Sequence, residues 1–510
     1  MKYYPSILAI LFPLIAPAQA AGDELFDTDQ VIDIQLTFAQ PAFWDSLTAY
    51  YAEGLERDLL GSVTITDLMG TYTYDSVGVR LKGNSSYGVQ GVKKSMKIDF
   101  NAYVSGQKYH GLKKINLNNG FNDPTFLREK IFFDFSHEQG VLAPRAVFSD
   151  LRINGTLWGF YGVVEQIDKT FLARWLGDND GNMFKAGDQF GSGGGNTAAD
   201  LAYYGSAQSG YTDRYELKTN EDVDDWSDLI ALLQLLNTLN NDDLTAQLPS
   251  QWDWEAMLRS LAMDNLFSNL DGYINSARNY YVYHDITTSK WNWIKWDANE
   301  SFGRYGNQAG NLLTLSPYYI APGRPLMTKI MGIPAFREDY LAEYCAAFGG
   351  FTNQLLDPRI DVLATLIQPH VLADPNKQYS NAQFTSNLAN DVTVNGGPGG
   401  SQTIYGLKSF IASRRSSLTG QLNCEQVGMI DLMPALELTI APNPCRDFIT
   451  ISPNSTGASR TATVTNAIGQ VQPVTISGNM IDVSVLTSGS YVLSVAVPDG
   501  HVFRSRFVKD

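Results

Sequence analysis

Cysteine and histidine are both scarce in this sequence. Its 510 residues include three cysteines and five histidines, and it contains neither a Cys-x-x-Cys nor a His-Glu-x-x-His pattern. Because zinc ligands are most often presented at such spacings, a zinc site is not expected. Three cysteines allow one disulfide, and we expect it between Cys345 and Cys424 because Cys445 lies beyond a predicted domain boundary.

Long apolar runs and an excess of cations are also missing. After the first twenty residues no stretch is long and apolar enough to cross a bilayer as a helix, so we expect no integral membrane segment. Acidic residues outnumber basic ones by 53 to 37, and the formal net charge is −16. This charge and the lack of a basic tail argue against nucleic acid or an anionic membrane as a general partner.

The first twenty residues have the pattern of a secretory signal peptide. Lys2 is followed by the apolar run Ile7–Ile15 and by Ala18-Gln19-Ala20, a small-residue cleavage site. The rest of the chain is too long for one core. Changes in the pattern of predicted strands, helices and turns divide the sequence into a signal peptide, a small N-terminal β-rich region, a central domain, a linker and a C-terminal domain (residues 1–20, 21–75, 76–425, 426–437 and 438–510).

One segment of the central domain has the pattern of a β-hairpin. Tyr280–His284 and Lys290–Trp296 are aromatic and β-branched runs, and Asp285–Ser289 between them is a turn. Pairing the runs about this turn places Asn279 within a few ångströms of Asp297.

The hairpin follows a loop that holds a further carboxylate, Asp271. An acid, an amide and a second acid before Phe-Gly is the order in which a kinase-type site supplies its base and its two metal ligands. These three residues are Asp271, Asn279 and Asp297. The other interpretation is a surface hairpin in which Asp and Asn form turns.

A second segment gathers cations around a turn-rich loop. Val77–Lys82 and Lys93–Phe100 alternate as strands on either side of Gly83–Gly88. One face of these strands carries Arg80, Lys82, Lys93, Ser95 and Lys97, whereas Met96, Ile98 and Phe100 face the core. Cations beside a loop with free backbone N–H groups suit a phosphate group. A lysine-rich edge strand that resists aggregation gives the same pattern.

A helix is predicted to begin at Asp123-Pro124, with Asp as the N-cap and Pro at the first helical position. Glu129 lies in its early turns. In a kinase-like lobe such a glutamate holds a nucleotide-binding lysine by an ion pair, and the alternative is a solvated helix face.

The segment from about Val77 to Leu418 resembles the CotH kinase family. The matching stretches include VRLKGNSSYGVQGVKKSMKIDF, FLREKIFFDFSHEQG, GFYGVVEQIDKTFLARW, RNYYVYHD and WDANESFG. The resemblance implies an α+β fold with a two-lobed, atypical protein-kinase-like domain that uses ATP and a divalent metal, Mg²⁺ or Mn²⁺.

The resemblance also implies roles for individual residues. Asp271 matches the catalytic-loop Asp, while Asn279 and Asp297 match the metal ligands. Four cations would bind the phosphates of ATP, namely Arg80, Lys82, Lys94 and Lys97. Glu129 would orient one of these lysines. The family usually has a second acid two residues after the metal-binding Asp, and here that position is Asn299.

The C-terminal region resembles the type IX secretion sorting domain of Bacteroidetes. The match rests on APNPCRDFITI (Ala441–Ile451), VTNAIGQ (Val464–Gln470) and IDVSVLTSGSYVLSV (Ile481–Val495). It implies a small Ig-like β-sandwich, the type IX machinery as a partner, and a secreted or cell-surface location reached through the periplasm and the outer membrane.

Together these patterns predict an exported kinase that transfers the γ-phosphate of ATP to a protein acceptor. Two alternatives remain open, because a fold does not determine a function. One is a non-catalytic surface binding protein on a kinase-like scaffold, and the other is a kinase-fold enzyme that transfers a group other than phosphate.

Overall fold

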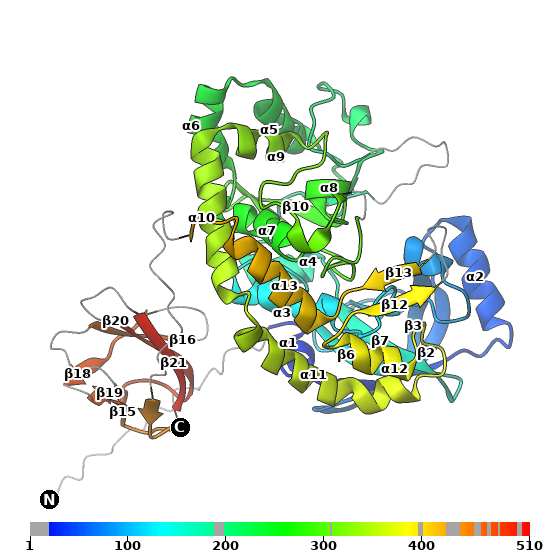
Figure 1. Cartoon of the computed structure of the whole chain (residues 1–510). Coiled ribbons are helices and arrows are strands. Elements are labelled where there is room, and N and C mark those ends of the chain that lie inside the picture. Colours follow the sequence, from blue (N-terminus) through cyan, green and yellow to red (C-terminus); the bar gives the residue numbers. More distant parts are fainter. Residues whose placement is uncertain are drawn as a thin grey trace, which may run out of the picture. The chain divides into compact units, whose positions relative to one another are not determined.

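The computed structural model describes residues 20–187, 198–306, 309–395, 401–424, 439–452, 461–466, 471–477, 480–496 and 502–509. The chain divides into two compact units, Met1–Leu422 and Asn423–Asp510. The predicted signal peptide, except Ala20, and the predicted linker lie outside the described residues. Helices and several separate sheets are both present (Figure 1), which confirms the α+β class.

A closed β-barrel forms the first half of the larger unit. Its strands follow the order β1-β2-β3-β4-β5-β7-β6, and β6 pairs in parallel with β1 to close it. Their bounds are β1 (Val31–Thr37), β2 (Leu59–Asp67), β3 (Gly70–Lys82), β4 (Ser95–Asp99), β5 (Lys114–Asn118), β6 (Ala146–Ile153) and β7 (Thr156–Glu165).

The barrel is filled by the apolar face of its strands. Val79 and Leu81 of β3 and Met96 and Ile98 of β4 belong to one buried cluster. The alternate positions carry Arg80, Lys82, Ser95 and Lys97, as expected. Lys93, which was expected on the same face, precedes β4 and is instead buried in an ion pair with Asp374.

The predicted N-terminal β-rich region is part of this barrel. Strands β1 and β2 pair directly with each other, and β2 pairs with β3. Strand β3 (Gly70–Lys82) runs across the predicted boundary between residues 75 and 76. Residues 31–75 therefore share the core of the residues that follow them, and α2 (Phe43–Glu53) packs against this core through Phe43, Trp44, Tyr50 and Tyr51.

A second, four-stranded sheet follows the barrel in the order β11-β10-β8-β9. Its strands are β8 (Met183–Ala186), β9 (Tyr215–Leu217), β10 (Tyr280–Asp285) and β11 (Lys290–Lys295). Strands β10 and β11 pair in register from Tyr280↔Lys295 to Asp285↔Lys290, which confirms the predicted hairpin.

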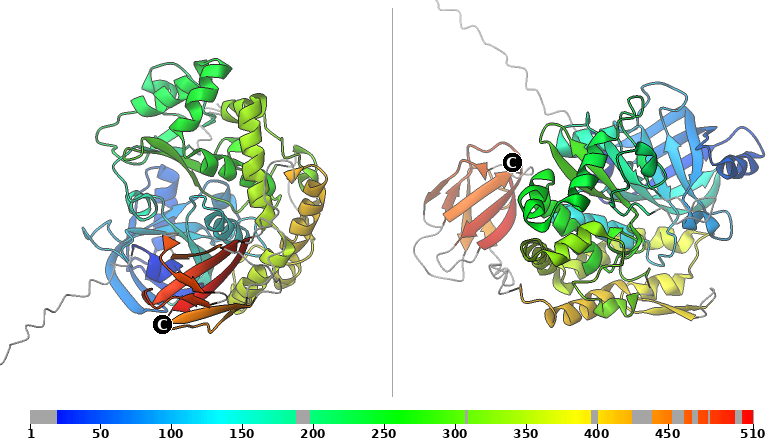
Figure 2. Two further views of the ribbon diagram at one scale, coloured as in Figure 1. Left: turned by 90° about the vertical axis from the view of Figure 1, so that its left-hand side faces the viewer. Right: turned by 90° about the horizontal axis from the view of Figure 1, so that it is seen from above.

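Helices supply most of the remaining part of the larger unit, and Figures 1 and 2 show the green helices on one side of the blue and cyan barrel. The helices are α1 (Asp23–Phe26), α3 (Arg128–Glu138), α4 (Lys169–Leu176), α5 (Ser227–Thr238), α6 (Asn241–Gln251), α7 (Trp254–Leu266), α8 (Tyr273–Ser276), α9 (Pro325–Gly332), α10 (Pro334–Gly350), α11 (Asn353–Ala373), α12 (Asn381–Asn387) and α13 (Leu407–Thr419). A two-stranded sheet, β12 (Val392–Asn395) and β13 (Ser401–Ile404), precedes α13.

The predicted start of α3 is wrong. The helix begins at Arg128 rather than at Asp123-Pro124. Phe126 has a φ of 58°, a left-handed conformation that interrupts a helix. The Asp123 carboxylate still accepts a hydrogen bond from the Arg128 backbone N–H at 2.9 Å, so it satisfies a helix-end donor from outside the helix.

The smaller unit contains two four-stranded sheets, in the orders β14-β15-β19-β18 and β17-β16-β20-β21. The strands are β14 (Thr439–Ala441), β15 (Phe448–Ser452), β16 (Thr461–Asn466), β17 (Val471–Gln472), β18 (Thr475–Ser477), β19 (Met480–Asp482), β20 (Gly489–Ala496) and β21 (Val502–Lys509). They share a core that includes Ile449, Val464, Ile481, Leu493 and Phe507. The immunoglobulin-like topology itself stays a prediction.

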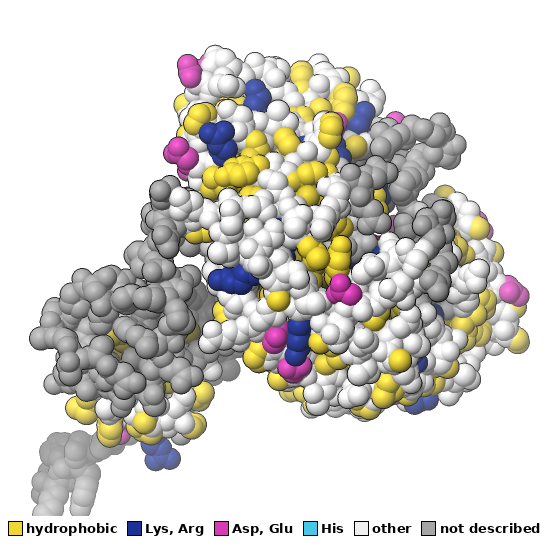
Figure 3. All heavy atoms as spheres, in the orientation of Figure 1, with side chains coloured by type: hydrophobic (Ala, Val, Ile, Leu, Met, Phe, Trp, Pro, Cys, Tyr) yellow, Lys and Arg dark blue, Asp and Glu magenta, His cyan; other side chains and the backbone are white. Residues whose placement is uncertain are grey.

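Cys345 and Cys424 are disulfide-bonded, as expected, and Cys445 is buried and takes no part in this disulfide. Among the described residues no helix is both long and apolar enough to cross a membrane. On the face drawn in Figure 3, charged side chains of both signs are scattered between polar and apolar ones.

Candidate active site

A cavity of about 1250 Å³ brings most of the predicted site residues together. Its wall includes residues of β3, β4 and β5 of the barrel, of α3, and of the segment that carries the hairpin. The predicted site residues that line it are Arg80, Lys82, Lys97, Glu129, Asp271, Asn279 and Asp297. Lys94 is not among the lining residues.

The cationic wall is built by strand pairing. Arg80 on β3 lies opposite Lys97 on β4, and Lys97 lies opposite Asn116 on β5. Lys82 lies two residues after Arg80 on β3, opposite Ser95. Since like charges directly opposite each other destabilise a sheet, this arrangement favours an anion bound against the cationic face of the sheet.

Arg80, Lys82 and Lys97 differ in their partners. Arg80 donates to Glu56 at 2.8 Å and to Asp58 at 3.0 Å. Lys82 donates to Asn116 Oδ1 at 3.1 Å. For Lys97 Nζ, no hydrogen bond or ion pair joins it to any residue that the structure describes.

Burial beside other cations lowers the pKa of Lys97 to about 7; loss of hydration is the main cause, followed by the charges of Arg80 and Lys82. An anion in the cavity would offset both effects. Lys97 is thus the cation of this wall most clearly available to a phosphate group.

Lys94 has a different position from the predicted one. Its Nζ donates to the backbone carbonyls of Tyr87 (2.7 Å) and Val89, within the loop that precedes β4. The Tyr87 ring stacks on Tyr51 of α2 at 3.5 Å between centroids, and the Tyr51 hydroxyl donates to Gly83 O at 2.5 Å. Lys94 therefore holds the shape of the loop, whose residues 83–86 line the cavity.

Glu129 lies on α3 at the junction of the cationic and acidic parts of the cavity. Asn118 Nδ2 donates to Glu129 Oε2 at 2.8 Å. Burial and the charge of Asp297 raise the pKa of Glu129 to about 7, although the Asn118 hydrogen bond and the Lys82 charge act in the opposite direction. Glu129 is therefore within electrostatic reach of both Lys82 and Asp297.

The acidic end of the cavity is formed where the hairpin begins and ends. Asn279 and Asp297 flank β10 and β11, and both have left-handed backbone conformations, with φ values of 59° and 52°. Asn279 Nδ2 donates to Asp271 Oδ2 at 2.9 Å and to Asp271 O at 3.1 Å. Asn and Asp adopt this conformation more readily than other non-glycine residues, so the chain can turn at both ends of the hairpin.

Asp271 has one oriented and one open carboxylate oxygen. Oδ2 accepts the Asn279 hydrogen bond, whereas Oδ1 is buried without a hydrogen-bond partner and lies 3.7 Å from Arg278 Nε. Burial, opposed by Arg278, is the main cause that raises the pKa of Asp271 to about 7, and the charges of Asp297 and Glu300 add to it. A carboxyl group with such a pKa can accept a proton near neutral pH.

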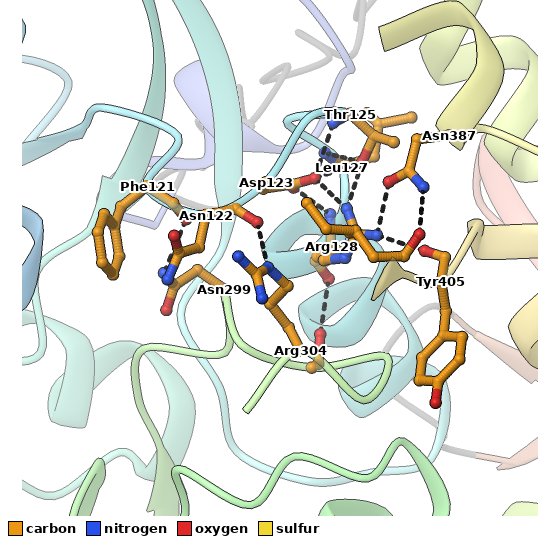
Figure 4. Close-up of polar contacts among 12 residues, drawn as sticks. Phe121, Asn122, Asp123, Thr125, Leu127, Arg128, Asn299, Arg304, Asn387 and Tyr405 are labelled. Atoms are coloured by element: carbon orange, nitrogen blue, oxygen red, sulfur yellow. Dashed lines mark hydrogen bonds and ion pairs between the residues drawn. The ribbon is translucent and has the colours of Figure 1, made fainter. Parts of the chain in front are cut away.

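Asn299 and Glu300 make contacts that the sequence did not predict. Asn299 Nδ2 donates to the backbone carbonyl of Phe121 at 3.1 Å, as Figure 4 shows. Glu300 Oε1 accepts from Asn122 Nδ2 at 2.8 Å, while its Oε2 is buried without a hydrogen-bond partner. Both residues line the cavity. Glu300 carried no signal in the sequence, because the turn that brings it back beside Asp297 could not be predicted.

Glu56, which lines the cavity, and Asp58 beside it are further residues near the site that sequence reasoning missed. They precede β2, in the predicted N-terminal β-rich region, and both pair with Arg80. The run of charges from Glu56 to Asp58 was the available signal. It gave no indication of its partner, since the pairing with β3 joins positions more than twenty residues apart.

The acidic end offers few ligands for a divalent cation. Within the described ranges no group of three or more His, Cys, Asp or Glu side chains is placed to hold a metal ion by itself. Mg²⁺, however, is usually bound by one or two carboxylates together with waters and substrate phosphates. Glu300 Oε2, which is buried and accepts no hydrogen bond from a described residue, fits such a hard cation.

Two parts of the chain match known families. Residues 79–418 match the family described as CotH kinase protein, and residues 439–509 match the secretion system C-terminal sorting domain. The sorting domain implies type IX secretion, and with it export to the cell surface or release.

Curated relatives match the same central region. Inner spore coat protein H of Bacillus subtilis is 29% identical over 296 residues, which are 57% of this chain and 77% of that protein. Invasin CotH3 of Rhizopus delemar is 24% identical over 407 residues, covering 75% of this chain and 66% of the invasin. Invasin CotH2 of the same fungus is 24% identical over 398 residues, covering 72% and 65%.

Among solved structures, the Shewanella oneidensis complex of HipA, HipB and operator DNA was matched at 10% identity, over 66% of this chain and 64% of the other. Its TM-score of 0.25 is too low to support a common fold.

Proposed function

Because the chain belongs to the CotH kinase protein family, we propose that it is an exported atypical kinase that transfers the γ-phosphate of ATP to a hydroxyl group of a protein acceptor. The observation that carries this proposal is the composition of one cavity. A wall that includes Lys97, a cation with no hydrogen bond or ion pair to any described residue, lines the same space as an end that holds Asp271, Asn279 and Asp297.

The cationic wall would bind the phosphates of ATP. Lys97 makes no hydrogen bond or ion pair with a described residue that ATP would have to displace. Lys82 lies on the neighbouring strand β3, two residues after Arg80, which is opposite Lys97. Arg80 is already paired with Glu56 and Asp58, so its role is to fix the position of β3 and to lower the proton affinity of Lys97. Backbone N–H groups of residues 83–86 add donors of the kind that bind phosphate.

The acidic end would carry out the transfer. The acceptor hydroxyl oxygen forms a bond to the γ-phosphorus, the bond from this phosphorus to the β–γ bridging oxygen breaks, and ADP leaves with that electron pair. The hydroxyl proton passes to Asp271, which Asn279 holds in place. Asn279 Oδ1 and Asp297 would hold Mg²⁺ or Mn²⁺, which neutralises phosphate charge when bound.

A second candidate function is binding to a surface without catalysis. Two relatives that match most of this chain are named invasins, and a kinase-like domain can serve as a binding scaffold. In that case the cavity would bind no nucleotide or would bind it without turnover.

Purified chain incubated with Mn²⁺ and ATP labelled at either the γ- or the α-phosphate tests the proposal. We expect label on the protein or on an added acceptor from γ-labelled ATP only, and none with the Asp271→Asn variant. Transfer from the α-label alone would indicate a nucleotidyl transferase. No transfer from either label, by a chain that is folded, would favour the binding function.

A further inference from the structure

Glu300 is almost fully buried beside the acidic end of the cavity, yet half of its carboxylate has no partner. Its exposed fraction is 5% and it lines the cavity. Oε2 makes no hydrogen bond, and none of the salt bridges among the described residues includes Glu300. A buried carboxylate oxygen left in this state destabilises the fold by about 1–3 kcal/mol, so its retention requires a reason.

The carboxylate is held in a fixed direction by its neighbours. Asn122 Nδ2 donates to Oε1 at 2.8 Å, and the backbone carbonyl of Asn122 accepts from Arg304 Nε at 2.9 Å. A turn in which Ser301 N donates to Ala298 O at 3.0 Å brings Glu300 back toward the end of β11. Figure 4 shows the hydrogen bond between Arg304 and Asn122. With Oε1 occupied, the unpartnered Oε2 is the oxygen available to a ligand.

The neighbouring position, Asn299, serves a different purpose. Its side-chain amide donates to the backbone carbonyl of Phe121 and so connects the end of the hairpin to the loop between β5 and α3. A carboxylate at this position could not donate that hydrogen bond, and its charge would repel the carbonyl oxygen. Asn299 is thus suited to positioning the loop and brings no charge to the cavity.

We propose that Glu300 supplies the second carboxylate charge of the divalent-cation site, beside Asp297, and that Asn299 is a positioning residue. This inference rests on the proposed function, since it assigns a residue to the same site. It follows from the burial and open valence of Glu300 Oε2 and from the commitment of the Asn299 amide to Phe121. The ligand is a hard cation, Mn²⁺ or Mg²⁺, shared with nucleotide phosphate and water.

Binding of Mn²⁺ to the full chain tests the assignment without relying on activity. Free Mn²⁺ is measured by electron paramagnetic resonance in the presence of a non-hydrolysable ATP analogue. We compare the unchanged chain with Glu300→Gln, which keeps an acceptor for Asn122, and with Glu338→Gln, a matched control that removes an exposed charge on α10. Asp297→Asn serves as the variant that should lose the ion in any case.

Glu300→Gln should weaken Mn²⁺ binding about 10- to 100-fold, the range typical of residues that support a metal site, while Glu338→Gln leaves it unchanged. Its melting temperature should stay the same or rise, since a buried charge is removed. Glu300→Asp, which keeps the charge on a shorter side chain, should bind Mn²⁺ more tightly than Glu300→Gln.

Two results overturn the inference and leave the proposed function intact. In the first, Glu300→Gln binds Mn²⁺ with the affinity of the unchanged chain while Asp297→Asn loses the ion. In the second, Glu300→Asp and Glu300→Gln lose the same amount of Mn²⁺ affinity. Absence of nucleotide-dependent Mn²⁺ binding by the unchanged chain would instead overturn the proposed function. The two failures are therefore distinguishable.

Discussion

Replacing Lys97 by methionine should stabilise the protein and weaken its binding of nucleotide. The side chain lies opposite Arg80, has no partner among the described residues, and has a pKa lowered from 10.5 to about 7. Such a difference corresponds to about 5 kcal/mol at 1.36 kcal/mol per pH unit. Because Lys97 keeps partial access to solvent, which screens its charge, we expect a gain in the free energy of unfolding of about 2–3 kcal/mol.

The direction of the Lys97 pKa shift determines how the stabilisation by Lys97→Met depends on pH. Below pH 7 Lys97 is protonated in both the folded and the unfolded chain, so its full destabilisation is present. Between pH 7 and 10.5 the folded chain releases the proton while the unfolded chain keeps it, and the destabilisation disappears progressively. The advantage of Lys97→Met should therefore be largest near pH 6 and absent above pH 10.5.

The assay combines thermal unfolding between pH 6 and 10 with calorimetric titration of an ATP analogue and Mn²⁺. Loss of one charge-assisted hydrogen bond should weaken nucleotide binding about 10- to 100-fold. Lys108→Met, which removes an exposed lysine outside the cavity wall, is the matched control and should change neither quantity. A less stable Lys97→Met chain near pH 6, or one with unchanged nucleotide affinity, would refute the reasoning.

Three further predictions concern the acidic end and the smaller unit. Asp271→Asn should lose transfer of the γ-label yet bind nucleotide as before, because its contact with the acceptor matters in the transition state; an equal loss of nucleotide affinity would make Asp271 a metal ligand. Asp297→Ala should lose the thermal stabilisation that ATP with Mn²⁺ confers, without unfolding at lower temperature in their absence, and retained stabilisation would remove Asp297 from the site. Truncation at Gln426, which keeps Cys424, should preserve nucleotide binding because the residues beyond it have a core of their own. The intact mass of the exported product should show that the region from about Leu438 has been removed. Loss of nucleotide binding on truncation, or an exported chain that still ends at Asp510, would contradict this pair of expectations.

Local patterns predicted the parts of the site that depend on neighbouring residues. The hairpin followed from two alternating runs and a turn, and its register places Asn279 and Asp297 at the same end. The apolar faces of β3 and β4 were predicted for the same reason, since strand periodicity decides which side chains enter a core.

Contacts between distant segments could not be predicted in this way. The left-handed Phe126 displaces the start of α3, and no helix signal in the sequence marks it. Lys94 and Lys97 are alike as sequence, but the fold turns one toward loop carbonyls and the other toward the cavity. The burial of Glu300 likewise depends on Asn122, a residue 178 positions away.

The closure of the barrel by its first strand has a kinetic consequence. Strand β1 pairs in parallel with β6, and Phe38 N donates to Asn154 Oδ1 at 2.8 Å across 116 positions of the chain. Loops of this length close slowly compared with hairpins such as β2–β3 and β10–β11. We therefore expect refolding in which strand content recovers before nucleotide binding does, because the cavity is complete only after β1 has paired with β6.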